Sequence, residues 1–384
     1  MDKQLENCDV LIIGGGPAGS SCAWQLHRSG LDVVIMDKAQ FPRQKVCAGW
    51  ITPAVLESLQ IDVEDYAGQN IIQPITGFRT GLIDGETVET RYPETVSYGI
   101  RRYELDDYLL RRSGARLKLG QGLDSLQREG NRWIVNGEIS TPLVIGAGGH
   151  FCPVARFMGA KLGADEPAIK AKEIEFRMDS TQSQNCKLRG DTPELYFCRD
   201  LAGYGWCFRK GDYLNIGLGR EGNHNLSEHL NHFCDFLKQH DKIPQDIPVD
   251  FHGHAYLLYG HGVRNQIGDG MLLIGDAAGL SYPQSGEGIR PAVESGLLAA
   301  ATILEAKGDY SRHQLQSYSS RLVSRFGQGK VPSSIVPLSI RNYVGGILLE
   351  NKWFTRNVVM DRWFLHSQQK ALRASAEVSS RLRV

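Results

Sequence analysis

Three glycines near the N-terminus have the spacing of a turn that wraps around a diphosphate. They are Gly14, Gly16 and Gly19, in the pattern GxGxxG. The apolar run 10–13 comes just before them, and a helix-forming run, 17–29, follows. In such a turn the first glycine allows a tight bend, the second leaves room for phosphates, and the third lets helix and strand pack closely. Free N–H groups at the helix start, around Pro17 and Ala18, would attract the phosphate charge.

An acidic residue at the end of the next strand favours a nucleotide at this turn. Asp37 follows the buried run 32–36, at a position where a carboxylate accepts hydrogen bonds from ribose hydroxyls. Lys38 comes next and is expected at the same nucleotide site. The alternative is a glycine turn without a ligand, but a strand, a helix and an acid in register all favour a dinucleotide.

Two later glycine-rich segments distinguish FAD from NAD through their resemblance to known flavoproteins. Residues 143–149 (LVIGAGG) resemble a strand and turn of two-domain flavoprotein hydroxylases. Residues 271–279 (MLLIGDAAG) resemble the segment in which an aspartate, here Asp276, lies beneath the flavin ribityl chain. In that fold a helix, which would start near Gly286–Gly288 with Ile289, points its N–H groups at the flavin O2. The resemblance implies noncovalent FAD on a glutathione-reductase-type fold.

A more specific resemblance depends on three motifs spread along the chain. They are FPRQKVCAGW at 41–50, YGWCFRKGDYLNIGLG at 204–219 and GLSYPQSGEGI at 279–289. Together they are similar to motifs of the geranylgeranyl reductase family of FAD-dependent oxidoreductases, which is related to flavoprotein aromatic hydroxylases and flavin halogenases. Members of that family reduce isolated C=C bonds of isoprenoid chains in pigments, quinones or archaeal lipids. The resemblance implies hydride transfer from reduced flavin to an apolar chain, with a proton added at the other carbon.

The same resemblance implies further residues that contact the cofactor. They are Arg43, Ala48, Arg102 and Gly148, and Asp106 matches the partner of the arginine at 102. The alternative for Arg102 is a solvated arginine at a helix start. Three positions depart from the pattern: Ala48 replaces a usual glycine, Arg209 a usual proline, and Gly148 an aspartate of the hydroxylases that also contacts NAD(P)H. The change at Gly148 leaves the electron donor open among NAD(P)H, a ferredoxin and a quinol-linked partner.

Cys47 is the sharpest candidate for a catalytic side chain. A soft thiol near flavin can donate a proton or tune the ring, and Lys45 would lower the pKa of the thiol if both side chains point the same way. The alternative for Cys47 is a small buried packing residue. Glu287 lies between two glycines at the expected helix start, where a catalytic role competes with simple complementation of the helix dipole.

Tyr204 and Trp206 are the remaining catalytic candidates. With Phe208 they alternate along an expected strand, so all three side chains lie on one face of it. An antiparallel sheet that turns this face to the flavin would give a dry wall against which an apolar chain is positioned. The alternative is that the rings are core residues of that sheet.

Two other classes of flavoprotein compete with the reductase interpretation. The first is a flavin-dependent monooxygenase, either a hydroxylase or a halogenase-like enzyme, acting on an aromatic or apolar small molecule. The WxWxIP signature of halogenases is missing, and only Trp206 of it is present. The second is a flavoprotein that binds FAD for structure or redox sensing without catalysis.

Composition excludes nucleic acid as a partner and points to the cytoplasm. The 43 basic residues balance the 43 acidic ones, so the chain lacks the charge of a nucleic-acid-binding protein. Eight cysteines without a CxxC pair favour reduced thiols. A first strand that begins near Cys8 leaves no room for a signal peptide, and no apolar run reaches membrane-spanning length.

The histidines are not expected to bind a metal. His229 and His232, with His224 upstream, lack a carboxylate or cysteine at ligand spacing and fit a solvated helix face. His252 and His254 alternate along a strand and are expected at the sheet surface or at an interface.

These elements predict an α/β protein with a glutathione-reductase-type, Rossmann-like FAD-binding domain, an antiparallel-sheet substrate domain and a helical C-terminal region. The predicted FAD-binding parts are 1–75, 99–165 and 263–310, the substrate-domain parts are 76–98 and 166–262, and the helical region is 311–384. Basic amphipathic helices in this last region suit either peripheral association with the inner membrane face or a lid packed on the substrate domain. The expected substrate is an apolar small molecule or lipid, with an electron-donor protein as a further partner.

Overall fold

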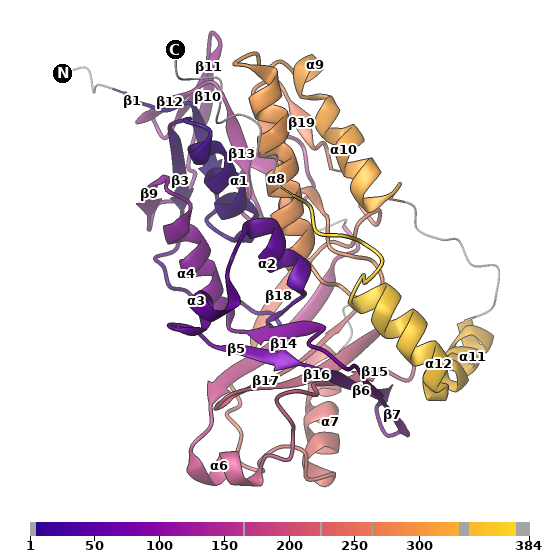
Figure 1. Ribbon diagram of the computed structural model, residues 1–384. Coiled ribbons are helices and arrows are strands. Elements are labelled where there is room, and N and C mark those ends of the chain that lie inside the picture. Colours follow the sequence, from indigo (N-terminus) through magenta and orange to yellow (C-terminus); the bar gives the residue numbers. More distant parts are fainter. Residues whose placement is uncertain (1–4, 164–165, 223–224, 263, 330–337, 374–384) are drawn as a thin grey trace.

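The computed structural model describes residues 5–163, 166–222, 225–262, 264–329 and 338–373. Figure 1 shows one half of the molecule built from β2, β3, α1 and α8, and another built from the broad sheet that contains β14, β16 and β17. The chain passes several times between these halves, so each is assembled from segments that are far apart in the sequence.

A mainly parallel sheet forms the centre of the first half, in the order β19-β20-β13-β2-β3-β9. Its strands are β2 (Val10–Ile13), β3 (Val33–Asp37), β9 (Arg116–Leu119), β13 (Val144–Gly146), β19 (Ile267–Gly268) and β20 (Met271–Leu273). Neighbours pair in parallel from β20 to β9, whereas β19 is antiparallel to β20. Every residue of β2 is buried, as its continuous apolar sequence predicts for a strand covered on both faces.

Two long helices pack side by side against this sheet: α1 (Pro17–Arg28) and α8 (Ile289–Ala306). Gly296 lies where they meet, and a Cβ there would be 2.4 Å from the carbonyl oxygen of Ala18. Only glycine therefore allows the two backbones to come this close. The remaining helices of this half are α4 (Arg102–Arg112), α5 (Pro153–Phe157), α9 (Arg312–Leu315), α10 (Ser317–Phe326) and the 3₁₀ turn η1 (Gly275–Ala278).

The second half is a larger sheet in the order β18-β14-β17-β16-β15-β6-β7. Its strands are β6 (Gly77–Leu82), β7 (Thr87–Arg91), β14 (Ile169–Arg177), β15 (Glu194–Phe197), β16 (Gly203–Lys210), β17 (Tyr213–Arg220) and β18 (His252–Tyr256). All its pairs are antiparallel except β15 with β6. Helix α7 (Leu226–Gln239) covers one face, where Phe233 packs on Gly205. The opposite face is turned toward the first half.

Short elements fill the connections. They are β1 (Glu6–Asn7), β4 (Trp50–Ile51), α2 (Pro53–Leu59), α3 (Val63–Ala67), β5 (Ile72–Ile75), β8 (Ser97–Ile100), β10 (Leu126–Glu129), β11 (Arg132–Val135), β12 (Ile139–Thr141) and α6 (Ser180–Asn185). The strands among these elements form two further small sheets, β1-β12-β11-β10 and β4-β8-β5. The second of these leads the chain from the glycine turn to the larger sheet.

The C-terminal region is helical only in part. Helices α11 (Leu338–Glu350) and α12 (Lys352–Phe354) continue into a π-helix, η2 (Thr355–Phe364), and lie beside β6 and β7 (Figure 1). The expectation of helix beyond this point is wrong for residues 365–373, which return across α8 without regular structure. The reason is that the Arg290 guanidinium donates to the carbonyl oxygen of Gln369 (2.6 Å), and that of Arg325 donates to the Lys370 carbonyl oxygen (2.7 Å). The basic positions beyond 373 lie outside the described residues.

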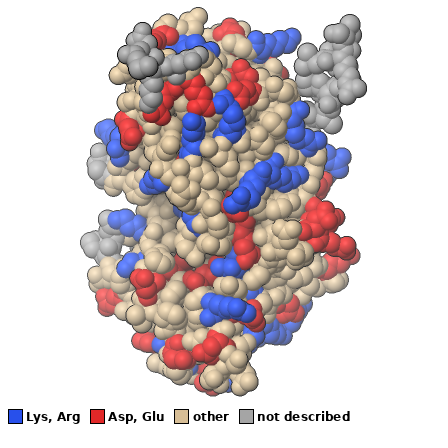
Figure 2. Space-filling view, turned by 90° about the vertical axis from the view of Figure 1, so that its left-hand side faces the viewer, with Lys and Arg blue, Asp and Glu red and all other residues tan. Residues whose placement is uncertain are grey.

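The surface carries both signs of charge. On the face in Figure 2 the Lys and Arg side chains are interspersed with Asp and Glu, without a broad field of one sign. In the described part of the chain, no helix combines the length and apolar character that crossing a bilayer requires.

Candidate functional site

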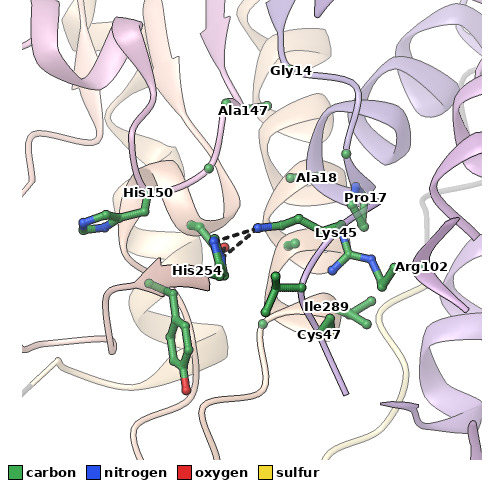
Figure 3. Close-up of a pocket in the computed structure, with 18 of the residues that line it drawn as sticks. Gly14, Pro17, Ala18, Lys45, Cys47, Arg102, Ala147, His150, His254 and Ile289 are labelled. Carbon is green, nitrogen blue, oxygen red and sulfur yellow. Dashed lines mark hydrogen bonds and ion pairs between the residues drawn. The ribbon is translucent and has the colours of Figure 1, made fainter. Parts of the chain in front are cut away.

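A cavity of about 460 Å³ lies between the two halves of the molecule. Its walls come from the glycine turn after β2, the loop 41–49 (the Cys47 loop), the start of α8, and strands β16 and β18. Figure 3 shows Lys45, Cys47, Arg102 and His254 converging on this space from different elements. The volume is in the range of small-molecule sites in proteins.

The three glycines of the turn have different roles. A Cβ at Gly14, where φ is +117°, would lie 2.4 Å from the Ala147 carbonyl oxygen, and one at Gly19 would lie 2.0 Å from that of Gly14. These two glycines therefore serve close packing. A Cβ at Gly16 would meet only the Arg43 side chain, at 3.5 Å, so Gly16 faces open cavity.

The first turn of α1 offers free donors to the cavity. Gly16 is the N-cap of the helix, without a side-chain cap, and no acidic residue lies in the first turn. The N–H groups that an N-terminus leaves unpaired therefore remain for an anion. Pro17 and Ala18 line the cavity here. Asp37 fixes the same turn, because its carboxylate accepts from the Gly15 N–H at 2.8 Å, and the exposed Lys38 lies beside it.

Two arginines share one buried carboxylate beside the glycine turn. Arg102 donates twice to Asp106, at 2.7 and 2.8 Å, and Arg43 lies 3.2 Å from the same carboxylate. Asp106 is fully buried, and both arginines line the cavity. Two guanidiniums against one carboxylate leave a net positive charge, which is suited to holding a diphosphate.

A chain of three titratable groups crosses the cavity from the Cys47 loop to η1. The ammonium of Lys45 lies 2.8 Å from His254 Nε2, and this nitrogen is 3.8 Å from a carboxylate oxygen of Asp276. Burial lowers the pKa of Lys45 to about 8, against the opposing effect of the Asp276 charge. Burial would raise the pKa of Asp276, but the His254 ring and the Lys45 charge bring it to about 2. Asp276 is therefore ionised at neutral pH.

The expectation for His254 needs correction. The sequence predicts it, with His252, at the sheet surface or at an interface, but it lines the cavity between the two halves, beside Lys45 and Asp276. The physical reason is that β18 is the edge strand of the larger sheet at the side where this sheet meets η1. His252 lies at the start of the same strand and is exposed.

Cys47 lines the cavity and is held by its backbone. Its sulfur accepts from the Gly49 N–H at 3.4 Å, and its carbonyl oxygen accepts from the Asn215 amide at 3.2 Å. Two cations, Arg102 and Lys45, interact with the thiol. The Lys45 ammonium also contacts His254, so Lys45 has a second partner across the cavity (Figure 3).

A buried polar group supports the Cys47 loop from the larger sheet. The Glu173 carboxylate accepts from the Cys47 N–H and contacts the Asn215 amide at 3.5 Å. Asn215 in turn accepts from the indole N–H of Trp206 at 2.8 Å. Burial raises the pKa of Glu173 to about 8, so the side chain is mostly neutral at pH 7.

Replacing Glu173 by Gln should change how stability depends on pH. A carboxyl whose pKa is raised in the folded state keeps its proton there while the unfolded chain loses it, so wild-type stability falls as pH rises from 4.5, the ordinary pKa of a glutamate, toward 8. The neutral amide of Glu173→Gln lacks this titration. The free energy of unfolding of the variant relative to wild type should therefore increase by roughly 1 kcal/mol per pH unit in this window. Urea denaturation at pH 5.5 and 8 measures it.

The exposed Glu86 provides the control for this experiment. The difference between Glu86→Gln and wild type should stay constant between the two pH values. A difference for Glu173→Gln that is equally constant would contradict a neutral buried carboxyl.

Aromatic side chains form the wall opposite the glycine turn. Tyr204 and Trp206 line the cavity, while Phe208 lies buried behind them in the same cluster. Trp50 and Phe364 complete this wall, with stacked rings 5.6 Å apart between centroids. Phe364 also packs edge-on against Tyr204 at 5.4 Å. The wall therefore combines segments from the start, middle and end of the chain.

The start of α8 closes the cavity. Gly288 is the N-cap, Ile289 is the first helical residue, and Gly286 adopts φ +69° in the preceding turn. Glu287 accepts from the Arg290 N–H at 2.6 Å, and burial raises the pKa of its carboxyl to about 7. Its second oxygen is buried without a partner among the described residues.

The structure also places the three positions that depart from the family pattern. Ala48 and Gly148 both line the cavity. A Cβ at Gly148 would be 3.3 Å from the Cys152 Cα, so a larger side chain there would be tightly constrained. Arg209, the third departure, instead donates to Ser183 and Cys186 on the outer side of the sheet.

The histidines of α7 have partners of other kinds. His229 contacts Arg220, and His232 lies 3.3 Å from an Asp84 oxygen. Within the ranges that the structure describes, no three His, Cys, Asp or Glu side chains gather as metal ligands would. His224 lies outside those ranges.

Among the residues that sequence reasoning missed are Trp50, His254 and Phe364 of the cavity lining, and Asn215, which supports the Cys47 loop. Trp50 ends the FPRQKVCAGW motif, so its position next to Cys47 was an available signal. Phe364 and Asn215 had none, because only the tertiary fold brings the C-terminal segment and β17 to the cavity.

The arrangement fits FAD. Gly16 leaves space at a helix N-terminus, Arg43 and Arg102 supply positive charge beside it, and the ionised Asp276 lies near a second helix N-terminus. A dinucleotide needs this sequence of features: phosphate donors, a hydroxyl acceptor and donors toward its flavin ring.

Comparisons with known proteins agree with this fit. The family described as FAD dependent oxidoreductase matches residues 9–91. The chain is 29% identical to digeranylgeranylglycerophospholipid reductase 3 of Methanosphaera stadtmanae, over 84% of each protein. It is also 29% identical to menaquinone reductase of Mycobacterium tuberculosis, over 84% of this chain and 82% of that protein.

Solved structures show the same fold. A geranylgeranyl bacteriochlorophyll reductase-like protein of Thermoplasma acidophilum superposes with a TM-score of 0.73 at 23% identity, covering 98% of this chain and 95% of that one. Flavin-dependent halogenases share the fold at 20% identity or less. The chain is thus an FAD-dependent oxidoreductase with the glutathione-reductase-type fold, similar in sequence and structure to the geranylgeranyl reductase family.

Proposed function

We propose that the protein reduces C=C bonds of an isoprenoid or another apolar chain. The observation that carries this proposal is the aromatic wall of Trp50, Tyr204, Trp206 and Phe364, which faces the expected flavin position beside Cys47. Such a wall suits a long chain without polar groups. The names of two relatives, a digeranylgeranylglycerophospholipid reductase and a menaquinone reductase, refer to molecules with isoprenoid chains and support this substrate class.

The residues around the cavity would hold the cofactor as follows. The N–H groups after Gly16, with Arg43 and Arg102, would bind the diphosphate, and Asp37 would bind a ribose. Asp276 would accept from the ribityl chain, and the N–H groups at Ile289 would face the flavin ring. When bound and reduced, FAD supplies the hydride.

Cys47 is our proposed source of the proton. The thiol lies on the cavity wall and interacts with the Arg102 guanidinium, which would stabilise the thiolate left after the proton moves to the second carbon of the former double bond. Lys45 would keep a positive charge close to the flavin below pH 8, through its contacts with His254 and Asp276. Tyr204 and Trp206 would position the chain.

The electron donor and the place of action are also proposals. We propose NAD(P)H or a ferredoxin as the donor, and the absence of a carboxylate at Gly148, which hydroxylase-like proteins direct at NAD(P)H, favours the ferredoxin. An isoprenoid substrate partitions into membranes, and we propose that the protein works in the cytoplasm at the inner membrane surface.

A reoxidation experiment tests the proposed reaction. FAD-loaded protein, reduced and kept free of oxygen, is mixed with geranylgeraniol in detergent, and the absorbance of oxidised flavin is followed. Reoxidation should be at least about 10-fold faster than with phytanol, the fully saturated chain, because only the alkene accepts the hydride. Mass spectrometry of the product should show two added hydrogens.

Two outcomes would assign the protein to another class. If the alkene causes no reoxidation but oxygen yields a hydroxylated product, the protein is a monooxygenase. If the flavin transfers electrons to neither, the flavoprotein is not a catalyst of this kind.

A further inference from the structure

Exposed apolar side chains gather on the C-terminal helices. The described residues contain ten large hydrophobic side chains that are exposed, and five of them lie between positions 343 and 353. They are Tyr343, Val344, Ile347 and Leu348 on α11 and Trp353 on α12, which we call the α11–α12 face. The four on α11 recur with helical spacing, so they form one continuous stripe. Tyr343 and Trp353 are 73% and 68% exposed. Such a cluster on a water-soluble surface indicates an interaction site.

The opposite side of these helices is anchored to the body of the molecule. Leu349 is buried, and Phe354 packs with it in the cluster that contains Phe364 and Trp206. Asn351 caps α12 by accepting from the Phe354 N–H at 2.9 Å. Figure 1 shows α11 and α12 lying along β6 and β7 at the edge of the molecule. The stripe is therefore presented by a fixed support.

The chemistry of the face matches a lipid surface. Trp and Tyr rings are enriched where a protein meets the boundary between headgroups and hydrocarbon. Lys352 on α12 and Arg362 on η2 are exposed, and neither pairs with a carboxylate among the described residues, while Glu350 at the end of α11 is an exposed acid. Cations next to an apolar stripe are attracted to anionic headgroups.

We propose that the α11–α12 face docks the protein on an anionic phospholipid bilayer and delivers a membrane-dissolved substrate to the cavity. The second part rests on the proposed function. It is supported by continuity, because Leu349 and Phe354 behind the face belong to the same cluster as Trp50, Tyr204 and Phe364 of the cavity wall. An apolar chain that leaves the bilayer here would meet apolar side chains along its way.

Vesicle flotation tests the docking itself. FAD-loaded wild-type protein is compared with Ile347→Glu/Trp353→Glu on vesicles of phosphatidylcholine with phosphatidylglycerol. The bound fraction of the variant should fall by at least about 10-fold, since two charges replace the apolar side chains that would insert. The control is Val249→Glu/Val323→Glu, which places the same charges at two other exposed apolar positions and should float like wild type.

A second measurement separates docking from catalysis. With geraniol, a short soluble alkene, the double variant and wild type should turn over equally, whereas reduction of geranylgeranyl chains embedded in vesicles should fall about 10-fold in the variant alone.

Equal flotation of variant and wild type overturns the proposal. So does a wild-type dimer that the variant converts to monomer in light scattering without any vesicle binding, because the face is then an interface between two copies. If no alkene is reduced by either protein while flotation still differs, the proposed reaction fails and the docking stands.

Discussion

Gly16→Val should give a folded but colourless protein. The structure leaves space at this glycine, since a Cβ would meet only the tip of the Arg43 side chain at 3.5 Å, so the variant should fold. The same space is where a diphosphate would approach the free N–H groups of α1. A valine fills it, and the Kd for FAD should rise by at least about 100-fold, or about 2.7 kcal/mol. Titration of apoprotein with FAD, followed by flavin fluorescence, gives the value.

The choice of glycine matters for this test. At Gly14 or Gly19 a side chain would collide with backbone carbonyl oxygens at 2.4 Å or less, and loss of colour there would only report misfolding. Gly68→Val is the matched control, because Gly68 is exposed and has helical backbone angles. It should remain yellow. If Gly16→Val retains stoichiometric FAD, the diphosphate does not lie at this turn.

Cys47→Ala should keep the flavin and lose turnover. The hydrogen bond of the sulfur with the Gly49 N–H is long, at 3.4 Å, and Arg102, which also interacts with the thiol, is held by Asp106, so removal of the sulfur should disturb the loop little. If the thiol supplies the proton, turnover should fall by at least about 100-fold while the Kd for FAD stays within about 2-fold. Single-turnover reoxidation by an alkene isolates the step.

Cys234→Ala is the control for this variant. Cys234 is a buried thiol of α7, far from the cavity lining, and its removal should leave turnover unchanged. Turnover of Cys47→Ala within a factor of about 2 of wild type refutes the chemical role of the thiol. A large fall in FAD affinity would instead show that Cys47 is needed for the shape of the loop.

Local patterns explain why much of the fold could be predicted. The glycine turn, the buried strand before it and the helix after it are neighbours in sequence, so their geometry follows from residue types. Side chains along strands β14 to β17 point alternately to the two faces of the sheet, and those of Tyr204 and Trp206 share a face, as their spacing predicts. The start of α8 was predictable from its flanking glycines to within two residues.

The features that could not be predicted from the sequence depend on contacts between distant segments. The position of β18 at the edge of its sheet decides that His254 faces the cavity, and strand order cannot be read from alternation. Lys45 and Cys47 lie on an irregular loop, and the further contacts of Lys45 with His254 and of Cys47 with Arg102 depend on the tertiary fold. Residues 365–373 lose helical structure because the buried Arg290 of α8 and the partly buried Arg325 of α10 donate to their carbonyl oxygens.

The contact between Gly296 and Ala18 has a consequence for how the cofactor would be gripped. It joins α1 and α8 backbone to backbone, and the N-termini of both helices line the cavity that a dinucleotide would occupy. The diphosphate and the flavin ring would then be bound by one rigid pair of helices rather than by two elements that move independently. A side chain added at 296 would push the two helices apart without contacting the bound dinucleotide.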